Sequence, residues 1–242
     1  MERGEIYKLG KHRLMCGDSL SLIDVKTLMN HKKAIMMFTD PPYNVDYKRE
    51  GHSWKYGYKS KIQNFKDTDF EIDKFLKLLE MEFIEGACYI CCGTAQIGKY
   101  VNWSQKFLKR NPHIIIWLKP NFSLIRGDYN RRYEQIMYLW FDKKKWRGEK
   151  SKSNSDVWYI QGRNVSKYIH PTQKPLMLII KAIENNSDKE DIVLDLFGGS
   201  GSTLIACEKT NRICYMMEIM PEYCEKIIQR YEKLTNKKAE KQ

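Results

Sequence analysis

Apolar residues gather in short continuous runs that recur along most of the chain. These runs predict strands at residues 14–16, 34–38, 87–92, 114–118, 136–141, 192–194 and 213–217. A strand with one face in solvent alternates apolar and polar residues, whereas these runs are apolar throughout. We therefore expect strands that are covered by helices on both faces, as in a parallel sheet.

Between the runs, apolar residues return at helical spacing. One such set precedes the third run and another follows Pro221: Phe75, Leu76, Leu79 and Phe83, and Cys224, Ile227, Ile228, Tyr231 and Leu234. Pro175 and Pro221 stand where a first helical turn would begin, which is a favoured place for proline. Strands that alternate with helices predict an α/β fold with a doubly wound sheet.

Two segments break this pattern, residues 44–66 and 142–169. Both interleave lysine and arginine with tyrosine or tryptophan, Trp146 and Trp158 among them. This mixture suits phosphate contacts combined with base stacking; the alternative is a solvated loop whose aromatic residues pack locally. The polar tail at 236–242 is expected to fray. A length of 242 residues suits a single domain with an insertion.

The charge balance points to a polyanionic partner. Lysine and arginine number 42 against 30 aspartate and glutamate, which gives a net charge of +12. Nucleic acid is the favoured partner and a membrane is not, although a lysine-rich composition shared by a whole proteome would give the same excess. No apolar stretch reaches the roughly 20 residues that span a bilayer, so we expect a cytoplasmic protein.

The seven cysteines show no pairing framework. Cys88 and Cys91 have the C-x-x-C spacing but lie in an apolar run without a second pair, so buried thiols are favoured over a zinc or redox site.

Asp40-Pro41-Pro42-Tyr43 directly follows the second apolar run. Proline has no N–H, so the Asp40 carboxylate and the Pro41 carbonyl remain there as hydrogen-bond acceptors. Two acceptors suit a nitrogen that carries two hydrogens, such as the exocyclic amino group of a nucleobase, and Tyr43 adds a flat face for stacking. Taken alone, the tetrapeptide could equally be an ordinary turn.

A glycine-rich segment, residues 195–201, follows the sixth run and opens a helical segment. Glycines let the backbone turn tightly and approach a ligand. No Gly-Lys-Ser/Thr follows, which excludes a Walker loop, and the segment is not a clean G-x-G-x-x-G. Glu218 stands at the end of the next run, where an acidic residue commonly holds a ribose diol. Together these features imply an adenosine-containing cofactor.

With these motifs in this order, the chain resembles the β class of S-adenosylmethionine-dependent DNA amino-methyltransferases, in which the catalytic motif precedes the cofactor loop. Residues 17–20, 170–175 and 221–223 match further motifs, and the likeness spans residues 6–234. The chain looks most similar to the DNA modification methylases of phages and prophage-like elements. The resemblance implies a Rossmann-like methyltransferase sheet, mostly parallel with an antiparallel edge strand, in a circularly permuted motif order.

The resemblance also implies residue roles. Asp40, Pro41, Pro42 and Tyr43 would form the catalytic motif. Cofactor contacts would come from Asp18, Asp40, Thr172, Lys174, Asp195, Phe197, Gly199, Ser200, Gly201 and Glu218. Within that set Glu218 would hold the ribose hydroxyls, Asp18 the adenine, and Thr172 with Lys174 the methionine carboxylate. No metal is implied.

The implied reaction is methyl transfer to the N6 amino group of adenine in a base flipped out of DNA. Aspartate rather than serine at position 40 favours adenine, and cytosine N4 is the alternative; RNA or protein glutamine is a weaker one. Cytosine-C5 chemistry is excluded because no proline in the chain precedes a cysteine. Relatives occur as monomers and as homodimers, and some act beside a cognate restriction endonuclease; the sequence leaves both matters open.

Overall fold

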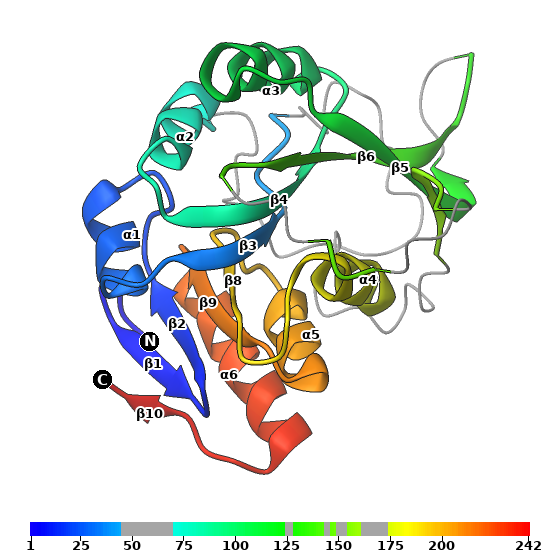
Figure 1. Ribbon diagram of the computed structural model, residues 1–242. Helices are drawn as coiled ribbons and strands as arrows, with labels where there is room; N and C mark the ends of the chain where they lie inside the picture. The colour runs from blue at the N-terminus through cyan, green and yellow to red at the C-terminus, as the bar shows by residue number, and fades with distance from the viewer. Residues whose placement is uncertain (45–69, 124–127, 143–145, 149–153, 161–173) are drawn as a thin grey trace.

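The computed structural model describes residues 1–44, 70–123, 128–142, 146–148, 154–160 and 174–242. In this part of the chain the strands form one ten-stranded sheet in the order β10-β1-β2-β9-β8-β3-β4-β6-β5-β7 (Figure 1). The strands are β1 (Ile6–Leu9), β2 (His12–Cys16), β3 (Ala34–Thr39), β4 (Ile84–Cys92), β5 (His113–Ser123), β6 (Arg131–Trp140), β7 (Val157–Tyr159), β8 (Ile192–Asp195), β9 (Ile213–Glu218) and β10 (Glu240–Lys241).

The centre of the sheet is parallel, as the continuous apolar runs predict. β2, β9, β8, β3 and β4 are neighbours in that order and all pair in parallel. The expected antiparallel edge strand is present, since β10 lies at the edge of the sheet and pairs antiparallel with β1. Two inner strands are antiparallel to their neighbours as well: β1 lies between β10 and β2, and β6 lies between β4 and β5. β6 has this position because the β5–β6 hairpin folds its second strand back against β4.

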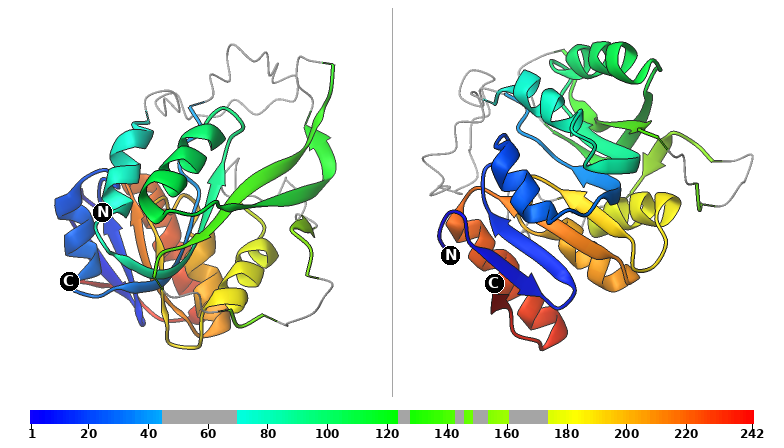
Figure 2. Two further views of the ribbon diagram at one scale, coloured as in Figure 1. Left: turned by 45° about the horizontal axis from the view of Figure 1, so that its top comes forward. Right: turned by 60° about the vertical axis from the view of Figure 1, so that its left-hand side comes forward.

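Helices cover both faces of the sheet (Figures 1 and 2). They are α1 (Leu22–Met29), α2 (Ile72–Leu79), α3 (Ile97–Trp103), which continues as a π-helix over Ser104–Leu108, α4 (Leu176–Asn186), α5 (Ser202–Thr210) and α6 (Pro221–Thr235). The first three pack on one face and the last three on the other. The sheet is therefore doubly wound, as expected from the sequence.

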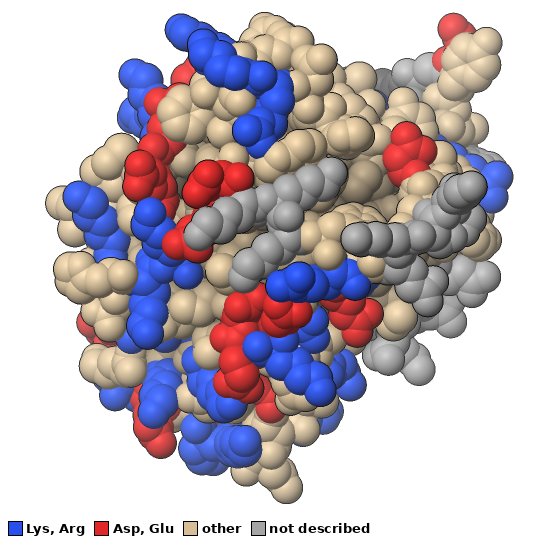
Figure 3. All heavy atoms as spheres, in the orientation of Figure 1, with Lys and Arg blue, Asp and Glu red and all other residues tan. Residues whose placement is uncertain are grey.

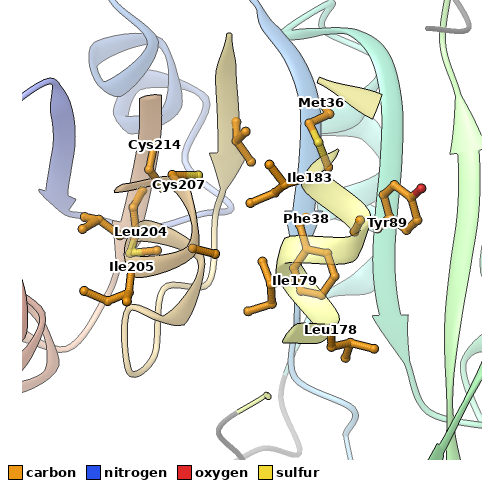
Figure 4. Packing of buried hydrophobic residues seen from close by; sticks show 14 of the residues in the cluster. Met36, Phe38, Tyr89, Leu178, Ile179, Ile183, Leu204, Ile205, Cys207 and Cys214 are labelled. Atoms are coloured by element: carbon orange, nitrogen blue, oxygen red, sulfur yellow. The ribbon is translucent and has the colours of Figure 1, made fainter. Parts of the chain in front are cut away.

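Side chains of the strands alternate between these two layers. Met36 and Phe38 of β3 face α4, and Figure 4 shows Ile179 and Ile183 of that helix pointing toward them. Met37, between them, faces the opposite layer. Each such side chain contributes roughly 1.5–3 kcal/mol when fully buried, so both faces of the central strands stabilise the fold.

Each predicted run lies within a strand or overlaps one, but three strands were missed: β1, β7 and β10. The polar tail does not fray as predicted. β10 pairs with β1 through Tyr7 and Lys241, and the Gln242 N–H donates to the Ile6 carbonyl at 2.9 Å. Backbone pairing, which needs no apolar side chain, orders this segment.

The cysteine prediction is confirmed: all seven thiols are free and buried. Among the described residues, no helix has both the length and the apolar character needed to cross a bilayer.

Candidate active site

The two motifs meet where neighbouring strands end. Asp40 follows β3 and Asp195 ends β8, and these strands pair in parallel through Met36 and Val193. The Thr39 hydroxyl donates to Asp195 Oδ1 at 3.1 Å, which joins the two strand ends directly. The helices that follow β3 and β8, α2 and α5, pack on opposite faces of the sheet, and such a switch point is where open α/β sheets bind ligands.

Both oxygens of the Asp40 carboxylate accept hydrogen bonds from the chain itself. The Tyr43 hydroxyl donates to Oδ1 at 2.8 Å and Lys174 Nζ donates to Oδ2 at 2.5 Å. Burial, and next the charge of Asp40, raise the pKa of Tyr43 well above its usual range, so its hydroxyl stays protonated and donates. The structure thus brings Asp40, Tyr43 and Lys174 together.

Lys174 is only 7% exposed and also faces a second carboxylate. Its Nζ lies 3.2 Å from Glu134 Oε2 on β6, while Lys119 Nζ on β5 lies 2.5 Å from the other oxygen, Oε1. Burial alone would lower the pKa of Lys174, but Asp40 and Glu134 raise it well above its usual range. Burial would likewise raise the pKa of Glu134, but Lys174 and Lys119 lower it overall. Lys119, Glu134, Lys174 and Asp40 therefore form a row of alternating positive and negative charges in the site.

Sequence reasoning missed Glu134 and Lys119. One signal was available. Glu134 lies on the same face of β6 as Ile136 and Tyr138, two and four positions further on, and those two residues face the α4 layer. A carboxylate at such a position is partly buried, and its buried oxygen favours a neighbouring cation.

The α3 side holds the tetrapeptide as well. Gln96 Nε2 donates to the Pro42 carbonyl at 3.1 Å, and a Cβ added to Gly93 would lie 3.3 Å from Tyr43 Cβ. A small pocket beside Tyr43 is lined by Gly93, Thr94, Tyr133, Glu134 and Gln135, with Cys92 and Arg131. Pro41 itself is buried.

The glycine loop closes onto Glu218. Gly199, at φ +51°, donates its N–H to Glu218 Oε2 at 2.6 Å, and the Met220 N–H donates to Oε1 at 2.9 Å. Gly201 has φ +76°, and a Cβ there would lie 2.9 Å from Ile227 Cγ1 on α6. The loop therefore needs glycine at position 201 both for its backbone conformation and for the close approach of α6.

Two other predicted cofactor residues are Phe197, within this loop, and Asp18, which directly follows Gly17 at the end of β2. Phe197 packs edge-on against Phe70 and Phe75, with ring centroids 5.4 Å apart in each case.

Gly17, the residue before Asp18, donates its N–H to the Glu218 carbonyl at 3.0 Å. The Asp18 carboxylate itself accepts from Arg3 at 3.3 Å and from the Leu20 N–H at 2.9 Å.

Ser200 is buried. Its Oγ lies 3.1 Å from Ser202 Oγ, and its carbonyl accepts from Arg230 at 2.8 Å. Thr172 lies outside the described residues.

Two buried carboxyls at this edge hold their protons to unusually high pH. Burial raises the pKa of Asp195 to about 6 and that of Glu218 to about 7. A group whose pKa is higher in the folded than in the unfolded state lowers the stability of the fold as pH rises between the two values. For Glu218 the unfolded pKa is 4.5 and the folded pKa is about 7.

We expect Glu218→Gln to remove this dependence in the ligand-free protein. Between pH 5 and pH 8 the free energy of unfolding of the wild type should fall, relative to the variant, by about 2–3 kcal/mol. Urea unfolding of both proteins across this range measures the difference. A gap that stays constant with pH would contradict the assigned protonation.

Part of the basic segment at 142–169 is described, and it corrects one expectation. Trp158, predicted to stack on bases, is 4% exposed in β7, where its ring centroid lies 6.0 Å from that of Tyr89. Pairing of β7 with β5 turns this side chain into the core.

A basic side chain of the same segment pairs within the protein: Arg147 Nη2 lies 2.7 Å from Asp188 Oδ2. Over the face seen in Figure 3, basic and acidic side chains are intermixed. Most of 44–66 and 142–169 lies outside the described residues.

Curated relatives match over most of the chain. The type II methyltransferase M2.MboI of Moraxella bovis is 29% identical over 88% of this chain and 86% of its own length. M.HpaI of Haemophilus parainfluenzae is 26% identical over 88% of the chain and 72% of its own length.

Solved structures share the fold. The M1.HpyAVI–SAM complex superposes with a TM-score of 0.66 at 24% identity, covering 90% of this chain and 97% of its own. The cytosine-N4-specific PvuII DNA methyltransferase gives a TM-score of 0.63 at 15% identity, covering 94% and 93%.

The model of one protein family, described as DNA methylase, matches residues 35–230 and so includes both the Asp40 tetrapeptide and the glycine loop. The order of these motifs and the fold agree with that match, and the chain belongs to the N6/N4 DNA methylase family, whose members use S-adenosylmethionine.

Proposed function

We propose that this chain transfers a methyl group from S-adenosylmethionine to the N6 amino group of adenine, in a base that has left the DNA duplex. The observation that carries this proposal is the position of Asp40. Its carboxylate lies at the end of β3, and through Thr39 that strand end is bonded to Asp195 beside the glycine loop. An amino-group acceptor and a cofactor loop thus share one edge of the sheet.

The residues at this edge fit S-adenosylmethionine. Glu218 is a buried carboxylate suited to a ribose diol, and its backbone is hydrogen-bonded to Gly17, the residue before Asp18. Asp195 and the loop at Phe197–Gly201 would hold the rest of the molecule, which supplies an electrophilic methyl group when bound. Lys174, predicted at the methionine carboxylate, instead contacts Asp40; its cofactor contact stays a prediction.

Asp40 would act by accepting hydrogen bonds. The N6 lone pair of adenine is delocalised into the ring, which makes the nitrogen a poor nucleophile. Acceptors on both of its hydrogens, the Asp40 carboxylate and the Pro41 carbonyl, would hold the nitrogen in place and stabilise the positive charge that develops on it. Extruding a base costs a few kcal/mol, and stacking on Tyr43 would offset roughly 1–3 kcal/mol of that cost.

The fold does not discriminate between the two bases, because a cytosine-N4-specific enzyme shares it. Aspartate at position 40 favours adenine by the habit of the family. DNA contacts by residues 44–66 and 142–169, a single-domain organisation, a homodimer and a cognate restriction endonuclease stay predictions.

Digestion of methylated DNA to nucleosides tests the proposal. Purified protein, DNA and labelled S-adenosylmethionine should yield N6-methyldeoxyadenosine as the labelled nucleoside. N4-methyldeoxycytidine as the labelled product would show that the target is the alternative base, cytosine. Label on RNA but not on DNA would overturn the proposal as a whole.

A further inference from the structure

A conflict at Asp40 is visible in the contacts of its carboxylate. The proposed reaction needs this carboxylate to accept from an amino group, yet Lys174 and Tyr43 already donate to its two oxygens. Lys174 is the stronger competitor, since its contact of 2.5 Å is charge-assisted. A group that draws Lys174 away would leave Asp40 Oδ2 free for the target.

Glu134 has the position and the free capacity for this. Its Oε2 atom is buried and lies 3.2 Å from Lys174 Nζ, without the geometry of a hydrogen bond. Its Oε1 atom is held by Lys119 at 2.5 Å, which fixes the carboxylate in place. One buried acceptor oxygen without a hydrogen-bond partner therefore lies beside the ammonium group that binds Asp40.

We propose that Glu134 is a positioning residue for methyl transfer, which takes over the Lys174 ammonium group when the target amino group binds Asp40. This inference rests on the proposed function. Lys174 would turn from one carboxylate to the other, and Asp40 Oδ2 would then accept a hydrogen from the substrate nitrogen.

The charges of the site make this exchange inexpensive. Lys119 and Lys174 balance Asp40 and Glu134, so the ammonium group is paired before and after it moves. A buried cation that loses its only partner costs several kcal/mol, and Lys174 is 7% exposed. Without a charge at Glu134, Lys174 would have to stay on Asp40 and compete with the substrate.

Glu134→Gln tests this directly, because glutamine keeps the size and an acceptor oxygen but removes the charge. We expect kcat to fall by about 10- to 100-fold, while KM for DNA and the affinity for S-adenosylmethionine change less than about threefold. Glu134→Asp restores the charge and should recover a large part of kcat. Glu82→Gln is the matched control, since Glu82 also lies 3.2 Å from a lysine, Lys33, but is exposed and outside the site.

The outcomes separate this inference from the proposed function. If the wild type methylates DNA and Glu134→Gln retains its kcat, the positioning role is wrong and the proposed function stands. A raised KM for DNA at unchanged kcat would make Glu134 a substrate-binding residue and also overturn it. A wild type that methylates no DNA rejects the proposed function itself. Should Glu134→Gln not fold, Glu134→Asp still decides, because a kcat as low as that of an Asp40 variant would show that charge at this position does not suffice.

Discussion

Asp40→Ala should lower the rate of methyl transfer by about 10³-fold, close to 4 kcal/mol of transition-state stabilisation. The substitution removes the acceptor that would hold the target amino group, and no other carboxylate ends β3. Affinity for S-adenosylmethionine should change less than about tenfold, because Asp195, Glu218 and the glycine loop are intact. Single-turnover assays with labelled cofactor measure the rate, and calorimetry measures the affinity.

The fold should survive this substitution. Lys174 loses its contact with Asp40 but keeps Glu134 at 3.2 Å, so the buried ammonium group remains paired. Asp73→Ala is the control, since Asp73 pairs with Lys99 on the surface and lies outside the site. Undiminished methyl transfer by the Asp40 variant would remove this residue from the reaction.

Gly201→Ala should destabilise the protein by about 3 kcal/mol, from the sum of a strained backbone and an overpacked contact. The residue has φ +76°, and the new methyl group would lie 2.9 Å from Ile227 Cγ1. Ile227 is 1% exposed on α6 and has little room to withdraw. Denaturant unfolding of variant and wild type gives the difference in free energy.

Gly4 offers a control with the backbone strain alone. Its φ is +90°, and a Cβ there would meet nothing within 4 Å. Gly4→Ala should therefore cost about 1 kcal/mol. If the two variants are equally destabilised, the contact with α6 contributes nothing and the packing argument for Gly201 fails.

The parallel strands at the centre of the sheet were predictable because both of their faces are buried. β3 and β9 carry uninterrupted apolar runs for that reason. β7 and β10 were not predictable, since they are short and are ordered by backbone pairing with neighbours distant in the chain. The same limit applies to Trp158, whose burial depends on the pairing of β7 with β5.

The site divides in a similar way. Asp40, Tyr43, Asp195 and Glu218 stand in local motifs and could be named from the sequence. The contact of Glu134 with Lys119 depends on the register of the β5–β6 hairpin, in which Trp117 is opposite Glu134. The contact of Lys174 with Asp40 joins residues 134 positions apart. Neither the register nor the packing of the segment before α4 can be obtained from residue spacing.

The hydrogen bond between Thr39 and Asp195 has a consequence for how the two substrates influence each other. Because this bond joins the strand end that carries Asp40 to the one that begins the glycine loop, a ligand that displaces one end would also act on the other, and the two binding free energies would be coupled. Such an energetic coupling is reciprocal at equilibrium. Whatever factor the methyl donor adds to the affinity for DNA, DNA adds to the affinity for the methyl donor.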